Sequence, residues 1–160
     1  MRPSLDSVQP LLLSEEIRTN AEDHFILFFT GLQRTASDIA TAQINNVDKK
    51  QNELRGISEL VSPATDALKK GDMETFGKLL HESWLLKRSL SDKISTTDMD
   101  SIYNSAIETG AYGGKILGAG GGGFFLFCVH PSKRQALIDK LGLLWMPVSF
   151  EFGGSQTVLV

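Results

Sequence analysis

Two short apolar runs interrupt a chain in which most hydrophobic residues have helical spacing. Residues 25–29 read FILFF, and residues 124–129 read FFLFCV. Runs this short and this rich in aromatic residues favour buried strands. The first run ends at Thr30 and Gly31, and the second follows a segment crowded with glycine. We therefore expect both runs to be strands of one small sheet.

The first half of the chain otherwise predicts helices. Ser14, followed by two glutamates, is typical of a helix N-cap and predicts a short helix toward Asp23. From about residue 32 to residue 70, apolar residues recur every three or four positions, as in amphipathic helices. Asn45-Asn46 and Pro63 are expected to interrupt or bend this helical stretch.

Gly71 and Asp72 mark the next boundary, as a helix stop followed by an N-cap. The amphipathic helix that follows ends near residues 91–93. Thr97, with Asp100 three residues later, resembles a capping box for another helix, which Gly110 ends. The apolar positions that define the first of these helices are Met73, Phe76, Leu79, Leu80 and Trp84.

The last third of the chain predicts a helix and further strands. Pro131 begins the helix and Gly142 ends it. Alternating residues over 148–152 predict a strand, followed by a Gly-Gly turn and a last strand over 156–160. This order predicts an α+β domain with a small, mainly antiparallel sheet covered by helices.

Composition is that of one folded domain. The chain has 160 residues, 41% of them hydrophobic and 22% charged, and its net charge is −3. This charge argues against a nucleic-acid surface, and no segment is long enough to span a membrane. The single cysteine, Cys128, lies in an apolar run and is expected to be a buried, inert thiol. With neither a disulfide nor a Cys/His metal cluster, the sequence predicts a cytoplasmic protein without a metal site of its own.

The most informative chemistry lies in residues 110–123, GAYGGKILGAGGGG, which hold eight of the fifteen glycines. Glycine concentrates where the backbone takes left-handed angles or approaches another group closely. The main-chain amides of such a segment commonly hold phosphate or another anion. The alternative is a turn that only allows close packing, but such a turn needs one or two glycines.

Three known phosphate motifs do not fit this segment. Gly118, Gly120 and Gly123 match GxGxxG, but a strand follows where a dinucleotide site requires a helix. A P-loop requires Lys-Ser or Lys-Thr after Gly123, where this chain has Phe124. The VAIK, HRD and DFG motifs of protein kinases do not occur. What remains is a glycine loop between two extended segments, the first of them near residues 115–117.

Residues 115–123, KILGAGGGG, closely resemble the third signature motif of the GHMP kinases, the superfamily of galactokinase, homoserine kinase, mevalonate kinase and phosphomevalonate kinase. Residues 29–37 (FTGLQRTAS), 81–90 (HESWLLKRSL) and 94–95 (IS) look most like the sugar-kinase branch that includes D-glycero-D-manno-heptose 7-phosphate kinase. The resemblance covers nearly the whole chain but only the C-terminal half of such an enzyme. It implies that residues 1–160 form the ferredoxin-like C-terminal domain of a GHMP kinase.

The resemblance implies a function in phosphoryl transfer. The complete kinase would use ATP and Mg²⁺ to phosphorylate a sugar or sugar phosphate, such as D-glycero-D-manno-heptose 7-phosphate. GHMP kinases carry the loop that wraps the ATP phosphates and a carboxylate near the substrate hydroxyl in their N-terminal half, and neither motif occurs here. We therefore expect this chain to be inactive alone and to require an N-terminal kinase half.

Other interpretations stay open at this point. The chain could be a non-catalytic α+β domain that binds an anionic metabolite or a protein partner through the same glycine segment. It could also be a structural fragment with a bare apolar interface, which would favour self-association. Homo-oligomerisation is compatible with each of these interpretations.

The resemblance also assigns site residues, none of them catalytic or metal-binding. Arg34 suits a sugar phosphate because a guanidinium binds the anion in a bidentate manner, although a surface arginine is equally expected there. Trp84 could stack on a sugar, but a core position is favoured; His81 and Lys87 border the same helix face. Lys115 either adds positive charge or is a solvated lysine at a strand edge. The phosphate-loop set is Lys115, Gly118, Ala119, Gly120, Gly121, Gly122 and Gly123, and the substrate-binding set is Thr30, Gly31, Arg34, His81, Trp84 and Lys87.

Overall fold

The computed structural model describes residues 10–32 and 36–151. No helix within these ranges is both long and apolar enough to cross a membrane. Short 3₁₀ helices, η2 (Val47–Lys49) and η3 (Pro131–Lys133), precede α3 and α7. The helices and strands are α1 (Glu15–His24), β1 (Phe25–Phe29), α2 (Ala36–Asn46), α3 (Gln51–Glu59), α4 (Val61–Lys70), α5 (Met73–Ser89), α6 (Thr97–Glu108), β2 (Ala111–Ile116), β3 (Phe124–Val129), α7 (Arg134–Leu141) and β4 (Trp145–Pro147).

Local signals place the ends of α1, α4 and α5 as predicted. The Ser14 hydroxyl accepts a hydrogen bond from the Ile17 amide at the start of α1. Gly71 follows α4 with a φ of 69°, and the Asp72 carboxylate accepts from the Thr75 amide at 3.0 Å to begin α5. Each contact satisfies a backbone group that a helix end leaves without a partner.

Two helix boundaries differ from the prediction. The N-cap of α6 is Thr96, whose hydroxyl accepts from the Met99 amide, and Thr97 is the first helical residue. Pro63 lies in the first turn of α4, where proline is tolerated because the N–H that it lacks would have no intrahelical acceptor. The break between α3 and α4 is therefore at Leu60.

Both edge strands begin earlier than predicted. β2 starts at Ala111, so Gly113 and Gly114 belong to a strand and not to the loop. β4 comprises Trp145–Pro147, while residues 148–151, where a strand was predicted, have no regular secondary structure. The predicted turn and last strand, at 153–160, lie outside the described residues.

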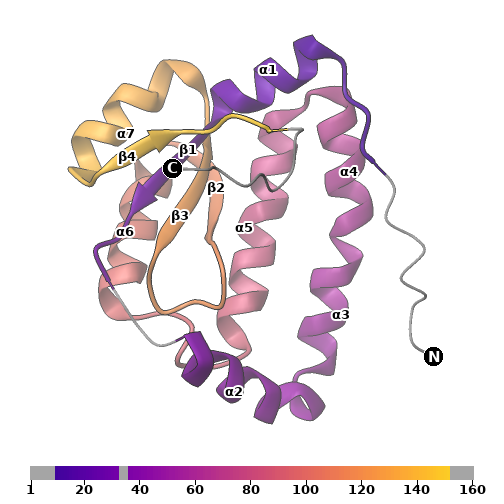
Figure 1. Ribbon diagram of the computed structural model, residues 1–160, viewed down its shortest axis with the longest axis vertical. Coiled ribbons are helices and arrows are strands. Elements are labelled where there is room, and N and C mark those ends of the chain that lie inside the picture. Colours follow the sequence, from indigo (N-terminus) through magenta and orange to yellow (C-terminus); the bar gives the residue numbers. More distant parts are fainter. Residues whose placement is uncertain (1–9, 33–35, 152–160) are drawn as a thin grey trace, which may run out of the picture.

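The four strands form one antiparallel sheet in the order β2-β3-β1-β4 (Figure 1). In this view α6 lies behind the sheet, and α5 runs along its β2 edge. The predicted α+β class is confirmed.

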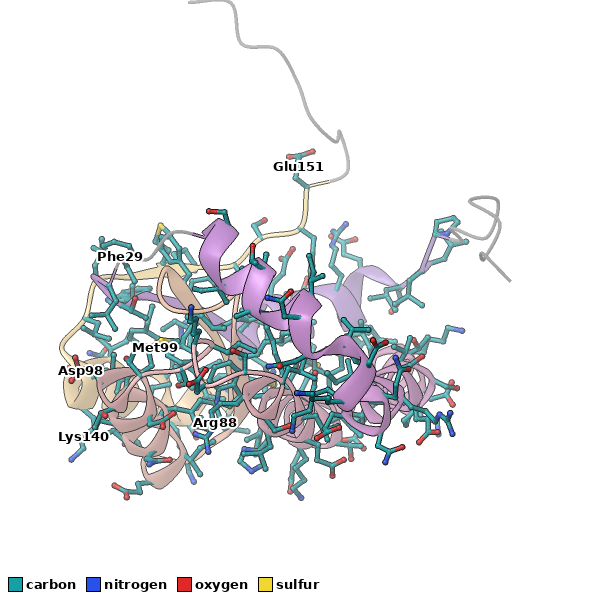
Figure 2. All side chains as sticks on the ribbon, turned by 90° about the horizontal axis from the view of Figure 1, so that it is seen from below. Phe29, Arg88, Asp98, Met99, Lys140 and Glu151 are labelled. Carbon is teal, nitrogen blue, oxygen red and sulfur yellow. The ribbon has the colours of Figure 1, made fainter. Side chains whose placement is uncertain are left out.

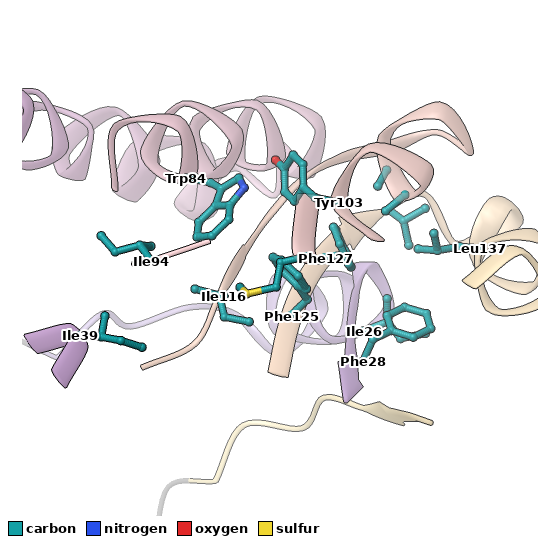
Figure 3. Packing of buried hydrophobic residues seen from close by; sticks show 14 of the residues in the cluster. Ile26, Phe28, Ile39, Trp84, Ile94, Tyr103, Ile116, Phe125, Phe127 and Leu137 are labelled. Carbon is teal, nitrogen blue, oxygen red and sulfur yellow. The ribbon is translucent and has the colours of Figure 1, made fainter. Parts of the chain in front are cut away.

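The main core lies on the α6 side of the sheet and contains a group of packed aromatic rings (Figure 3). Trp84 of α5 meets Phe125 edge-on, with ring centroids 5.6 Å apart. Tyr103 of α6 lies 5.7 Å from Phe127. All four rings are almost completely buried, and Leu137 of α7 extends the same cluster. These contacts hold α5, α6 and α7 on the sheet.

α5 approaches β2 unusually closely because both elements have glycine at the contact. A Cβ on Gly113 would lie only 2.0 Å from the carbonyl oxygen of Gly77, and a Cβ on Gly77 would lie 2.4 Å from Tyr112 Cβ. Two glycines of the glycine-rich segment thus serve packing: Gly113, and Gly114, whose Cβ would meet the Phe127 ring at 2.4 Å. This packing brings the C-terminal end of α5 toward the loop that follows β2.

Candidate functional site

The glycine loop, residues 118–123, connects β2 to β3. All five of its glycines have a positive φ, from 73° at Gly121 to 155° at Gly122. At Gly122 a close contact also requires glycine, because a Cβ there would lie 2.2 Å from the Leu32 carbonyl oxygen. A Cβ on Gly118 would meet nothing within 4 Å. Gly118 is exposed whereas Gly121 is buried, so the beginning of the loop is its open end and the part from Gly121 onward is its packed end.

Backbone contacts from distant parts of the chain hold the packed end. The Gly121 amide donates to the Ile94 carbonyl at 2.8 Å, and the Gly123 amide donates to the Leu32 carbonyl at 3.1 Å. The Gly123 carbonyl in turn accepts from both the amide and the hydroxyl of Thr30, each at 2.9 Å. The loop is thereby tied to the end of β1 and to the segment before α6.

Two side chains hold carbonyl groups at the open end. Gln43 of α2 donates from Nε2 to the Ala119 carbonyl at 2.8 Å. Lys87 of α5 donates from Nζ to the Gly118 carbonyl. Two consecutive peptide groups therefore have their carbonyl oxygens engaged by side chains of different helices.

Four loop amides have no acceptor within the described residues. Amides that are exposed in a fixed loop and lack protein partners form a site suited to an anion. Gly118 is exposed and the other three residues are half-buried, so all four are within reach of solvent. The four amides belong to Gly118, Ala119, Gly120 and Gly122.

Positive charge lies beside these amides. Burial, and secondarily the neighbouring Lys115, lower the pKa of Lys87 to about 8. Lys115 lies on β2, opposite Leu126, three residues before the loop begins. In the described part of the chain no carboxylate lies within 4 Å of either ammonium group. The two lysines and the free amides together favour binding of a phosphate-like anion.

The remaining residues of the predicted substrate-binding set are distributed differently. Thr30 is buried and uses its hydroxyl on Gly123, so it supports the loop. Gly31 is exposed with a φ of 70°. Arg34 lies outside the described residues. The structure thus brings Thr30 and Lys87 to the loop.

His81 and Trp84 face the aromatic core. His81 Nδ1 lies 2.7 Å from the Tyr103 hydroxyl, and the two rings stack with centroids 5.8 Å apart. Burial raises the pKa of Tyr103 above its ordinary value. Trp84 has no exposed surface, and its Nε1 has no hydrogen-bond partner among the residues that the structure describes. The core position favoured from the sequence is therefore confirmed: the indole packs on Phe125, and Trp84 is withdrawn from the substrate-binding set.

Sequence reasoning missed several groups that shape the loop. Gln43 lies on a helix far from the loop in sequence, and only its contact with the Ala119 carbonyl reveals its role. Ile94 and Leu32 act through backbone carbonyls, which carry no signal in residue identity. The contact between Lys87 and Gly118 spans 31 residues and was not predicted either.

The sheet face opposite α6 is apolar and partly open near the glycine loop. Leu126, Leu27 and Met146 are cross-strand neighbours on this face, as are Phe124 and Phe29 in the adjacent row. Met146 is 39% exposed and the other four are half-buried. Figure 2 shows Phe29 on the side of the molecule away from Met99 and Asp98 of α6.

Comparison with protein families agrees with this geometry. A family model described as the C-terminal region of GHMP kinases matches residues 64–145, just over half of the chain, including β2 and the glycine loop. The chain belongs to the GHMP kinase family. The resemblance noted in the sequence is confirmed.

Individual relatives are kinases of several small molecules. D-glycero-alpha-D-manno-heptose 7-phosphate kinase of Campylobacter jejuni is 34% identical over 136 residues, which are 84% of this chain and 40% of that protein. A galactokinase of Thermococcus kodakarensis is 32% identical over 103 residues, covering 59% of this chain and 29% of that protein. The chain thus spans well under half of the length of these relatives.

Solved structures share the fold. Mevalonate kinase of L. major, in complex with R-mevalonate, superposes with a TM-score of 0.65 at 23% identity, covering 74% of this chain and 37% of that one. A D-glycero-D-manno-heptose 1-phosphate kinase from Bacteroides thetaiotaomicron superposes with a TM-score of 0.60 at 24% identity, covering 88% of this chain and 37% of that one. At these identities the likeness establishes the fold alone.

Proposed function

We propose that this GHMP kinase C-terminal domain works as one part of an ATP-dependent sugar kinase, in which the glycine loop stabilises the phosphoryl group during transfer. The observation that carries the proposal is the combination of fixed, unpartnered loop amides with Lys87 and Lys115, which no carboxylate neutralises in the described part. The proposed acceptor is a sugar phosphate of the heptose 7-phosphate type, because the heptose kinase relative matches 84% of this chain.

The chemistry requires little from this domain beyond position and charge. Phosphoryl transfer is accelerated mainly by orientation and by neutralising the charge on the equatorial oxygens. Donors that are already oriented need no reorganisation when that charge develops. Lys115 and the amides of Ala119 and Gly120 would supply such donors.

ATP and Mg²⁺ would enter with the nucleotide-binding part of the kinase. No cluster of three or more His, Cys, Asp or Glu side chains suited to a metal ion occurs in residues 10–32 and 36–151. Mg²⁺ commonly retains waters and binds through nucleotide phosphates and one or two carboxylates. The metal would neutralise phosphate charge, while this domain supports the phosphoryl group from its other side.

The nucleotide-binding part is proposed to dock on the open sheet face. Half-buried Leu27, Phe29, Phe124 and Leu126 lie next to the glycine loop, so a partner that covered them would also close over the loop. The relatives that this chain matches are more than twice its length, which leaves a second domain of suitable size to fill that face.

Reconstitution tests the proposal. The chain would be purified alone and mixed with a GHMP-type N-terminal half, and ATP turnover measured against sugar phosphates led by D-glycero-D-manno-heptose 7-phosphate. We expect turnover only in the mixture. Lys115→Ala should lower kcat about 10²-fold, whereas Lys78→Ala, an exposed lysine paired with Glu74 on α5, should leave it unchanged.

The outcomes separate the proposal from its alternative. Equal kcat values for Lys115→Ala and wild type would remove Lys115 from the phosphate site. No turnover, with the two halves shown to associate, would instead favour a non-catalytic domain that binds an anionic metabolite through the same loop.

A further inference from the structure

We infer that Lys87 is a proton-linked positioning residue, whose ammonium group orients the glycine loop for anion binding and releases it on deprotonation. The inference rests on the proposed anion-binding role of the loop and goes beyond it by naming what controls the loop. Lys87 was expected to contact substrate; its geometry assigns it to the loop backbone.

The contact with Gly118 determines the direction of an amide. In a trans peptide group the C=O and the following N–H point in opposite directions. By holding the Gly118 carbonyl, Lys87 therefore points the Ala119 amide away from α5 and into the open side of the loop. Gln43 does the same for the next peptide group: it holds the Ala119 carbonyl and thereby orients the Gly120 amide.

Of these two side chains only Lys87 can lose its charge near neutral pH. It emerges three residues after the buried Trp84 and is itself half-buried. Removal from water disfavours the ammonium form, and the adjacent Lys115 disfavours it further, which places its pKa at about 8. A bound anion would favour the ammonium form, so binding and proton uptake are coupled.

Among the described residues, no carboxylate lies within 4 Å of the Lys87 ammonium group. From β2 the facing titratable group is Lys115. Helix α3 packs along α5. Its Glu53 pairs with Lys50, and its Arg55 and Glu59 are exposed. Arg88, the residue after Lys87 on α5, pairs with Asp100.

NMR titration of the isolated chain with sulfate tests the inference, since the charge of sulfate is constant over the relevant pH range. The ¹³Cε shift of Lys87 reports its protonation, and the Ala119 and Gly120 amide shifts report binding. We expect a Lys87 midpoint near pH 8 that rises with sulfate. If only the ammonium form supports binding, sulfate affinity falls about tenfold from pH 7 to pH 9.

Substitutions separate positioning from general charge. Lys87→Arg keeps a permanent cation, so sulfate should bind as at pH 7 with no decline up to pH 9. Lys87→Met should bind weakly at both pH values, with the shift change centred on Ala119. Lys78→Met, on the exposed side of α5, should match wild type.

Two results would overturn the inference: a Lys87 midpoint that sulfate does not move, or Lys87→Met binding as tightly as wild type. An absence of sulfate-induced shifts at pH 7 would also reject it. These failures are distinct from failure of the proposed function, which kinase turnover of the reconstituted halves and its response to Lys115→Ala decide independently.

Discussion

Gly113→Ala is the sharpest test of how α5 is placed. A Cβ at this position would lie 2.0 Å from the Gly77 carbonyl oxygen and 2.9 Å from both the Cβ and the backbone nitrogen of His81. Two of these neighbours are backbone atoms of a helix, so no side-chain rotation relieves the contact. Alanine therefore requires α5 and β2 to separate.

The size of that separation sets the expected cost. Cβ atoms essentially never lie closer than 3.0 Å to such an atom, so the two elements must move apart by about 1 Å. Overpacking of a close contact costs about 1–3 kcal/mol, and we expect the upper end because both partners are backbone. In a domain of this size each kcal/mol lowers Tm by roughly 2–4 °C, which predicts a decrease of about 6–12 °C.

Urea and thermal unfolding followed by circular dichroism would measure this loss. Gly118→Ala is the control, because its Cβ meets nothing within 4 Å and only the φ of 76° opposes it, a strain of about 1–2 kcal/mol. Gly77→Ala should resemble Gly113→Ala, and the double variant should cost less than their sum, since one separation accommodates both methyl groups. A loss below about 1 kcal/mol for Gly113→Ala would refute the close α5–β2 contact.

Three further predictions concern single side chains. Thr30→Val removes the hydroxyl that donates to Gly123 and should lower the free energy of unfolding by about 1–2 kcal/mol in urea; an unchanged urea midpoint would contradict the loop tether. Because the pKa of Lys87 is about 8 in the folded chain against an ordinary value of 10.5 for a lysine in the unfolded chain, the unfolded chain binds more protons between these values. Wild type should therefore gain stability relative to Lys87→Met as pH rises from 8 to 10, and a constant difference in urea midpoints would exclude this linkage. Burial raises the pKa of the Cys128 thiol to about 12, so its reaction with a disulfide reagent should require unfolding and accelerate with urea; labelling at the rate of a free thiol would show that β3 is accessible.

Local signals predicted the elements well because their causes are local. Ser14, Gly71 and Asp72 end or begin helices through hydrogen bonds or backbone angles within four residues of themselves. The choice between Thr96 and Thr97 as the cap of α6 is different. Either residue type can cap, so sequence alone does not distinguish them.

In the glycine-rich segment, the sequence did not show which glycines belong to the strand and which to the loop. The sequence predicted an extended segment only near residues 115–117, yet Gly113 and Gly114 also lie in β2, where the backbone of α5 and the Phe127 ring leave no room for a Cβ. Gly118 and Gly120, by contrast, serve the loop with φ values of 76° and 121°. Which demand each glycine meets depends on tertiary neighbours, and residue identity does not carry that information.

The contacts that hold the glycine loop could not be predicted from the sequence either, and they bear on the proposed function. Among the described residues, the loop is contacted by backbone carbonyls of Leu32 and Ile94 and by side chains of Thr30, Gln43 and Lys87. The described residues thus orient the loop amides without a second domain, so a partner that docks on the open sheet face would meet donors already in position. Donors that are already oriented can stabilise the charge that develops during phosphoryl transfer without reorganising first. It follows that loosening a loop contact should weaken anion binding even where the aromatic core, and with it the fold, is left intact.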